Sequence, residues 1–406
     1  LATSVPYQSL GALFRRFLRF GCLAWGGPVA QIAMLRRELV DQERWISSQR
    51  FNRTLAVYQA LPGPEAHELC VYFGYLARGR IGGLLAGIGF MLPGLILMLA
   101  LSWFYVDVGV ASPLILAGFA GCQAAVLALI VRAIHRIGTH ALTDRWLAAI
   151  ALLSMSAAIA GIHFAVVLSG SGILYLVAVR GRRWLAGWLA VLAIGLLVAS
   201  AISAPRDETD PVRVERATTE EQPAGGASAG ELVTSGLRAG LLTFGGAYTA
   251  IPFLQEDAVV SGGWMTSRTF LDGVALSGVL PAPLIIFSTF VGYVAGGPIG
   301  ALAMTTGIFA PAFLLTLVGH RHLERLVEHQ ATHALLDGVT AGVVGLITAT
   351  SLLLAPIAIR GIAGAAIFGL ALVALYVWRS GAAVAAVVGG AGVVGLVVFG
   401  VLGLSA

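Results

Sequence analysis

The sequence predicts an all-α polytopic membrane protein built from two inverted-topology repeats that contain broken or re-entrant helices. Hydrophobic residues make up 58% of the 406 positions and charged residues only 11%, whereas a soluble domain carries about 25% charged residues. One set of Trp, Gly and Pro landmarks occurs twice at a constant spacing. The arginines of alternating loops give the two copies opposite orientations in the bilayer.

The duplication is visible in the Gly- and Pro-containing motifs. Trp25–Pro28 (WGGP) and Leu61–Pro64 (LPGP) recur 219 residues later as Phe244–Ala247 (FGGA) and Leu280–Pro283 (LPAP). Further along, the offset shortens to 218. A spacing that is kept over so many landmarks indicates that one ancestral unit was duplicated and fused.

The chain therefore divides into three parts. Residues 1–203 form the N-terminal transporter repeat and residues 231–406 form the C-terminal repeat. Residues 204–230 are rich in charge, Pro, Gly and Ala, which predicts a solvated linker. The segment 184–203 is expected to be an extra helix without a counterpart in the second half.

Apolar runs of about 20 residues predict the spans. In the first half these are Gly82–Trp103, Ser112–Arg132, Trp146–Ala160, Phe164–Val179 and Trp184–Ser203. In the second half they are Gly300–Val318, Ala334–Leu354, Ile357–Val377 and Ala382–Gly403. Five spans between the first cytoplasmic loop and the linker invert the second repeat.

Arginine-rich loops are expected in the cytoplasm. The predicted inner loops carry Arg78 and Arg80; Arg132, Arg136 and Arg145; Arg180, Arg182 and Arg183; and Arg321, Arg325 and Arg379. Among the arginines in the loops between the spans of the second half, Arg360 is the one that disagrees with this topology.

The segment 50–78 is too interrupted to be an ordinary span. Helices over 51–61 and 64–77 are expected on either side of Pro62-Gly63-Pro64, because proline breaks a helix and suits the first turn of the next one. Arginines on both flanks predict a re-entrant hairpin with this break at its tip, and a single kinked span is the alternative. A second break at Gly26–Pro28 is expected to begin a helix over Val29–Val40.

Irregular backbone at membrane depth is tolerated only where protein buries it or where it lines a cavity. If the breaks of both halves gather near the midplane, the N–H groups of their helix N-termini form an anion site. The alternative is that these Gly and Pro residues are only kinks and close-packing points. The predicted substrate-binding residues are Gly26, Gly27, Pro28, Gln31, Gln59, Pro62, Gly63, Pro64, Gly245, Gly246, Tyr248, Pro281, Ala282 and Pro283.

Three ionisable residues follow the first Pro-Gly-Pro. Glu65, His67 and Glu68 are candidates for carrying a coupling proton, since ionisable groups inside a membrane are costly and are usually functional. The alternative is that Glu65 caps the helix and that the other two face water or the membrane interface. Arg53, about two turns before the break, is expected to steer anions inward.

The composition also limits the chemistry. All 25 basic residues are arginine, so Schiff-base chemistry at a lysine is excluded. Cys22, Cys70 and Cys122 have no metal-ligand spacing. We expect neither a cofactor nor a metal site, and the net charge of +5 indicates cytoplasmic loops, not a nucleic-acid partner.

These motifs resemble the chromate ion transporter family in its long, two-half form. The resemblance spans essentially the whole chain. The residues that carry it are Trp25-Gly26-Gly27-Pro28, Gln31, Glu38, Arg44-Trp45, Phe51, Leu61–Ala66, Phe244–Tyr248, Gly263-Trp264 and Leu271-Asp272-Gly273. Two positions depart from the family pattern: Ala282 stands where many relatives have Gly, and His67 and Glu68 stand where relatives often have uncharged polar residues.

The resemblance implies a secondary transporter in the lipid bilayer of the bacterial inner membrane. Its implied activity is export of chromate from the cytoplasm, coupled to the proton gradient as in an antiporter, which gives chromate resistance. Sulfate, a tetrahedral dianion of similar size, is an expected competitor. The alternatives are an inward or outward carrier of sulfate or another oxyanion, a passive channel, and an intramembrane chromate reductase, for which no cofactor motif or cysteine pair is visible. Carriers of this size also form homodimers, and the sequence leaves the oligomeric state open.

Overall fold

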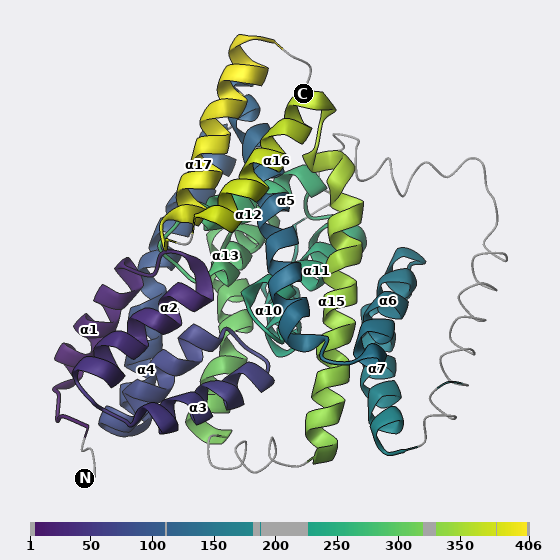
Figure 1. Cartoon of the computed structure of the whole chain (residues 1–406). Coiled ribbons are helices and arrows are strands. Elements are labelled where there is room, and N and C mark those ends of the chain that lie inside the picture. The colour runs from purple at the N-terminus through teal and green to yellow at the C-terminus, as the bar shows by residue number, and fades with distance from the viewer. Residues whose placement is uncertain are drawn as a thin grey trace.

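The computed structural model describes residues 5–109, 112–181, 187, 226–319, 330–378 and 380–403, and this part is helical throughout (Figure 1). The first half contains α1 (Leu10–Cys22), α2 (Gly27–Leu35), π-helix η1 (Arg36–Gln42), α3 (Ser48–Ala60), α4 (Glu65–Trp103), π-helix η2 (Phe104–Gly109), α5 (Pro113–Ala141), α6 (Arg145–Ile159) and α7 (Phe164–Val179). The extra helix expected at 184–203 and most of the linker lie outside the described residues.

The second half repeats this order. It contains α10 (Ala229–Leu241), 3-10 helix η3 (Ala247–Ala250), α11 (Ile251–Gln255), π-helix η4 (Glu256–Ser261), α12 (Ser267–Val279), 3-10 helix η5 (Leu284–Ile286), α13 (Phe287–Leu314), π-helix η6 (Leu315–Gly319), α15 (Gln330–Ala358), α16 (Gly361–Val377), α17 (Ala383–Gly395) and π-helix η7 (Leu396–Val401). Within the described residues, five helices are long and apolar enough to cross a membrane. The protein is thus a multi-pass membrane protein.

The duplication extends to backbone geometry. Gly26 and Gly27 have positive φ values of 89° and 75°, and their counterparts Gly245 and Gly246 have 76° and 121°. Such angles are readily available only to glycine. Both glycine pairs interrupt the chain between a first helix and a second helical segment that ends in a π-helix.

The first two helical segments of each repeat form a hairpin. An ion pair of 2.6 Å joins Arg19 on α1 to Glu38 on η1, and a second pair of 2.6 Å joins Arg16 to Glu43. The charged run 36–42 is therefore helical and is held against α1. In the second repeat, Arg238 pairs with Asp257 at the same offset of 219.

The segment 50–78 folds back on itself, as the re-entrant prediction required. Arg50, near the start of α3, donates from Nε to the hydroxyl of Tyr72 at 3.1 Å, and Phe51 stacks on Phe73 at 6.4 Å between ring centroids. The later residues of this segment thus lie beside its beginning. The single kinked span is excluded.

The helix α4 consists of two packed parts. Its backbone leaves helical geometry at Arg78 and Gly79, and the chain reverses so that a Cβ on Gly74 would lie 2.4 Å from the carbonyl oxygen of Gly82. Helix α13 has the same break, at Gly296 and Gly297. Glycines permit this close approach because no side chain separates the two backbones.

The long helices α5 and α15 occupy equivalent positions and run in opposite directions. Gln123, in the first half of α5, accepts a hydrogen bond from Arg360, which lies two residues after the end of α15 at Ala358. The C-terminal part of α5 and the N-terminal part of α15 instead line one cavity. The repeats are therefore inverted. One detail of the prediction was wrong: Arg132 and Arg136 lie within α5, not in a loop, because the helix continues to Ala141.

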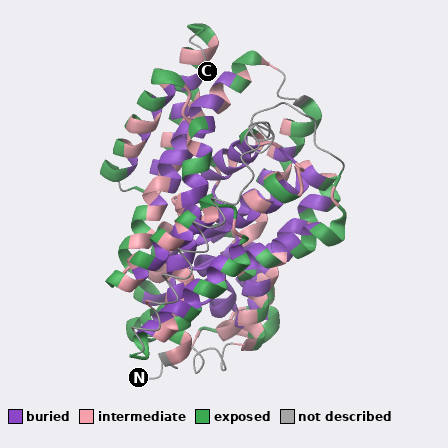
Figure 2. Cartoon of the chain, turned by 90° about the vertical axis from the view of Figure 1, so that its right-hand side faces the viewer, coloured by how far each residue is buried: buried purple, intermediate pink, exposed green. Residues whose placement is uncertain are grey.

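The last two helices of each repeat pack on the opposite repeat. Helices α6 and α7 contact α15, while α16 and α17 contact α5 (Figure 1). Small residues allow this packing, as where the carbonyl oxygen of Ala151 lies 2.4 Å from the position of a Cβ on Gly345. Helices α5 and α15 form the centre, and exposed residues lie mainly on the outer helices (Figure 2).

Candidate functional site

The tips of the hairpins from both repeats meet. The amide of Gly63, in the first Pro-Gly-Pro, donates to the carbonyl of Thr243 at 2.8 Å, immediately before the second Gly-Gly motif. The side chain of Gln31 on α2 donates from Nε2 to the carbonyl of Ala24 at 2.9 Å and to that of Ala282 at 3.1 Å. The breaks that the sequence placed in separate halves thus form one contiguous region.

A cavity of about 500 Å³ opens beside these tips. Helices α3, α5 and α15, the start of α4 and the two Gly-Gly regions surround it. Its lining residues are Pro28, Ala56, Gln59, Glu65, Ala133, Arg136, Ile137, His140, Ala141, Thr143, Gly245, Gly246, Tyr248, His333, Leu336, Asp337 and Thr340. The cavity is thus built by both repeats, at the place where secondary transporters bind substrate.

Among the described residues that line the cavity, Arg136 is the only arginine. It attracts the carboxylate of Glu65, which lies at the first position of α4. Near the mouth, His333 and Asp337 are joined by a contact of 3.0 Å. The cavity therefore offers a permanent cation beside helix ends, a combination that suits an anion.

The structure brings some of the predicted binding residues to the cavity and places others behind it. Those that line it are Pro28, Gln59, Gly245, Gly246 and Tyr248, together with the proton-coupling candidate Glu65. The remaining predicted binding residues are Gly26, Gln31, Pro62, Gly63, Pro64, Pro281, Ala282, Pro283 and Gly27. All of these except Gly27 pack around the hairpin tips or flank them. Gly27 begins α2, directly before the cavity-lining Pro28. Two of them are committed to contacts between the repeats, since the Gly63 amide and the Gln31 amide group already have acceptors.

His67 and Glu68 lie behind the cavity wall and are fully buried. The ring of His67 packs between Phe309 and Phe313 of α13, at 4.9 and 4.8 Å between centroids. Neither carboxyl oxygen of Glu68 has a hydrogen-bond partner among the described residues. The alternative in which these two side chains face water is therefore excluded, whereas their part in proton transfer stays a prediction.

The structure places Arg53 outside the cavity lining and Arg136 within it, while anion steering by Arg53 stays a prediction. Arg53 is exposed on α3 and does not line the cavity. Arg136, which was assigned to a loop, lines it. Arg132 and Arg136 lie one turn apart in a continuous apolar helix, and this spacing was the available signal that the helix extended beyond Arg132.

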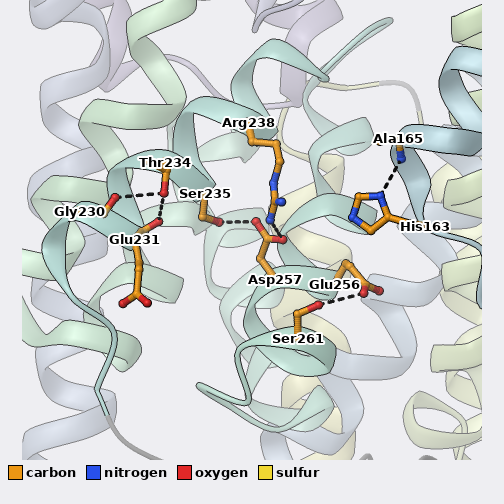
Figure 3. Close-up of polar contacts among 10 residues, drawn as sticks. All are labelled: His163, Ala165, Gly230, Glu231, Thr234, Ser235, Arg238, Glu256, Asp257 and Ser261. Carbon is orange, nitrogen blue, oxygen red and sulfur yellow. Dashed lines mark hydrogen bonds and ion pairs between the residues drawn. The ribbon is translucent and has the colours of Figure 1, made fainter.

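A second polar pocket lies around the hairpin of the second repeat (Figure 3). Its arginine, Arg238, is paired with the buried carboxylate of Asp257, which also accepts from the hydroxyl of Ser235 at 2.6 Å. The guanidinium lies over the ring of Phe164, 5.3 Å from its centroid. These polar groups satisfy one another, so the cluster holds the hairpin to its neighbours and offers no unpaired cation.

An all-helical membrane protein with inverted repeats, interrupted helices and a polar cavity between the repeats has the architecture of a secondary transporter. The model of the family described as "Chromate transporter" matches residues 11–177 and, separately, residues 230–396. The chain belongs to this family.

Individual relatives agree with this assignment. The chain is 54% identical over 399 residues to the chromate transport protein of Pseudomonas aeruginosa, covering 97% of this chain and 94% of that protein. It is 28% identical to the chromate transport protein of Cupriavidus metallidurans, with coverage of 98% and 96%. An uncharacterised transporter of Methanocaldococcus jannaschii is 26% identical, with coverage of 90% and 89%. No solved structure matches the chain.

Proposed function

We propose that this protein is a secondary active transporter that exports chromate from the cytoplasm across the bacterial inner membrane and thereby gives chromate resistance. The observation that carries the proposal is the cavity between the inverted repeats, with Arg136 facing the Gly-Gly region of the second repeat. The 54% identity to a chromate transport protein supports chromate as the anion.

The arginine pattern supports the direction. The cavity opens at the C-terminal end of α5, next to Arg145 at the start of α6. Loops rich in arginine remain in the cytoplasm, so this end of the molecule faces inward. A cavity open to the cytoplasm receives the anion that an exporter must bind.

In the proposed cycle, the dianion enters the cavity and approaches Arg136. Backbone N–H groups near Gly245 and Gly246, with Gln59 and Tyr248 as side-chain donors, complete its coordination. The repeats then move against each other, the cavity closes, and the site opens on the opposite side. Chromate crosses unchanged, and reduced chromium released by the purified protein would contradict this mechanism.

We propose that Glu65 and Glu68 exchange the coupling proton during the return of the empty carrier. Glu65 lines the cavity and Glu68 lies one turn further along the same helix face. Glu68 has no described donor, and an ionised carboxylate without partners is costly in a protein interior. A proton on this pair removes that cost.

The test is flux of chromate into everted proteoliposomes with and without an imposed pH difference, with sulfate as competitor. Uptake that is accelerated when the lumen is acidic supports proton-coupled export. Uptake of sulfate at equal efficiency, with no preference for chromate, would instead favour a general oxyanion carrier, and flux indifferent to any gradient would indicate a channel.

Arg136→Gln tests the site itself. It removes the permanent cation of the cavity, and we expect chromate flux to fall by about 100-fold, since charge-assisted contacts to an anion are strong. Arg145→Gln is the matched control, because it removes an arginine from the same end of the molecule without touching the cavity lining. Unaltered flux in the first variant would rule out this cavity as the chromate site.

A further inference from the structure

A second polar network lies at the far end of α5 from the cavity. Asp272 on α12 is 3% exposed and accepts from the hydroxyl of Tyr105 at 2.8 Å and from Nε2 of Gln123 at 2.8 Å. The Oε1 atom of Gln123 accepts in turn from the guanidinium of Arg360 at 3.1 Å. The charges of Asp272 and Arg360 are thus linked through one amide group.

The network joins the two repeats. Tyr105 and Gln123 belong to the first repeat, and Asp272 and Arg360 to the second. The ring of Tyr105 packs edge-on against Phe290, at 5.1 Å between centroids, and Phe119, at 5.5 Å. Apolar side chains thus surround the polar contacts on this side, and the Asp272 carboxylate is shielded from water.

The internal repeat allows the contact between Asp272 and Gln123 to be compared with the equivalent place in the other half. Helix α12 is the counterpart of α3, and α5 is the counterpart of α15. Helix α12 packs against α5 through Asp272 and Gln123. In the equivalent pair, Ala56 and Gln59 of α3 face Asp337 and Thr340 of α15 across the cavity. The α12–α5 interface is therefore packed closely, whereas the equivalent α3–α15 pair makes fewer contacts and borders the cavity.

We infer that Asp272, Gln123, Tyr105 and Arg360 form the gate that closes the carrier at the end opposite the cavity. This inference rests on the proposed carrier function, because only a carrier needs to open and close its two ends in turn. Breaking the network separates α12 from α5 and exposes the site on the opposite side.

The network also contains the exception in the arginine topology. Arg360 lies on the side that the arginine pattern of the loops assigns to the outside, and Arg268 at the start of α12 is near it. It is partly buried and donates to the carbonyl of Ile357 and to Gln123. The residue in the same N-cap position of the first repeat is Asp144, which caps α6 at the cavity end.

Matched cysteine reporters test the gate without any substrate. Ala56 lines the cavity, and Ala275, its counterpart 219 residues later, is 2% exposed behind the gate. Each is replaced by cysteine in a protein whose Cys22, Cys70 and Cys122 are alanine. Labelling by a membrane-impermeant maleimide is then measured from each face of oriented vesicles. With the gate intact, A56C should react from the cavity face and A275C from neither face.

Asp272→Asn replaces one acceptor oxygen of the carboxylate by an amide NH₂ group. This donor faces Gln123 or Tyr105, which themselves donate to Asp272. We expect A275C to become reactive from the face opposite the cavity, with a rate increased about tenfold, the population shift expected from losing a charge-assisted hydrogen bond. Labelling of A56C should slow in parallel. Tyr105→Phe removes one hydroxyl, keeps the packed ring and should give a smaller change in the same direction.

Tyr175→Phe is the matched control, since it removes a Tyr–Asp hydrogen bond of the same length, to Asp144, away from the gate. It should leave both labelling rates unchanged. If A275C stays protected in D272N and Y105F, each eluting as folded protein, the network is not a gate. Absence of chromate flux with normal labelling changes would instead contradict the proposed substrate and leave the gate intact.

Discussion

At the scale of single residues, the buried side chain of Glu68 requires a glycine at position 63. Gly63 has a φ of 148°, and a Cβ at this position would lie 2.6 Å from Oε1 of Glu68. The glycine is therefore required both by the backbone conformation of the Pro-Gly-Pro tip and by the space that the buried carboxyl group occupies.

Glu68→Gln keeps the shape of this side chain and removes its ability to carry a proton. If Glu68 takes part in coupling, chromate flux should lose its response to an imposed pH difference and keep its response to a membrane potential. The measurement is flux in proteoliposomes with each gradient imposed alone. Glu256→Gln, at a carboxyl group bonded to Ser261 in the other repeat, should retain both responses. An unaltered pH response in Glu68→Gln would exclude this residue as the coupling group.

Gly246 permits a test of the cavity by filling it. It lines the cavity and has a φ of 121°, with open space around the position of a Cβ. Gly246→Leu should abolish chromate transport while folded protein remains in the membrane. Gly297→Leu introduces comparable backbone strain, because its φ of 64° and ψ of −158° are likewise open essentially only to glycine, and it also lies in open space but away from the cavity. Loss of transport in both variants would show that strain, not blockage, is responsible.

The hairpin elements are fastened by equivalent ion pairs that differ in burial. The side chain of Glu38 is 18% exposed, whereas that of Asp257 is 3% exposed. An exposed ion pair contributes little to stability, and a buried carboxylate that loses its partner is left uncompensated. The same ion pair is therefore partly exposed in the first repeat and has a buried carboxylate in the second.

Arg238→Gln should destabilise the protein more than Arg19→Gln does. We expect a loss of about 1–2 kcal/mol for the former, reduced from the full value for a buried pair because Arg238 is partly exposed, and at most about 1 kcal/mol for the latter. Thermal unfolding in detergent, followed by size-exclusion chromatography, provides the comparison. Equal losses would mean that burial of Asp257 has no energetic weight.

The elements that depend on local chemistry could be predicted from the sequence. Gly-Gly and Pro-X-Pro breaks act on the backbone within a few residues, so the hairpins and the repeat followed from them directly. The place of Arg136 was missed because the helix end was assigned from charge, whereas a helix that borders a water-filled cavity can carry arginine along one face. The gate network was also missed, since Tyr105, Gln123, Asp272 and Arg360 are brought together only by tertiary packing.

The proposed transport cycle moves net charge across the membrane, because chromate is a dianion. Moving one charge through a potential of 100 mV involves about 2.3 kcal/mol, hence about 4.6 kcal/mol for a dianion that leaves a negative interior. Proton entry adds to this charge movement. Export should therefore be electrogenic, and a potassium diffusion potential set with valinomycin should accelerate or slow chromate flux according to its sign. Flux that does not respond to either sign would require compensating charge movement and would contradict the proposed stoichiometry of dianion export with proton entry.

The crossed packing of the terminal helices has a consequence for biogenesis. The first repeat emerges from the ribosome with α6 and α7 lacking the surface of α15 on which they rest. The sides of α6 and α7 that contact α15 remain exposed to lipid until α15 (Gln330–Ala358) has been inserted. Both copies therefore reach their final packing only after α15 is in place, and a translation product ending in the linker would lack the surface on which α6 and α7 rest.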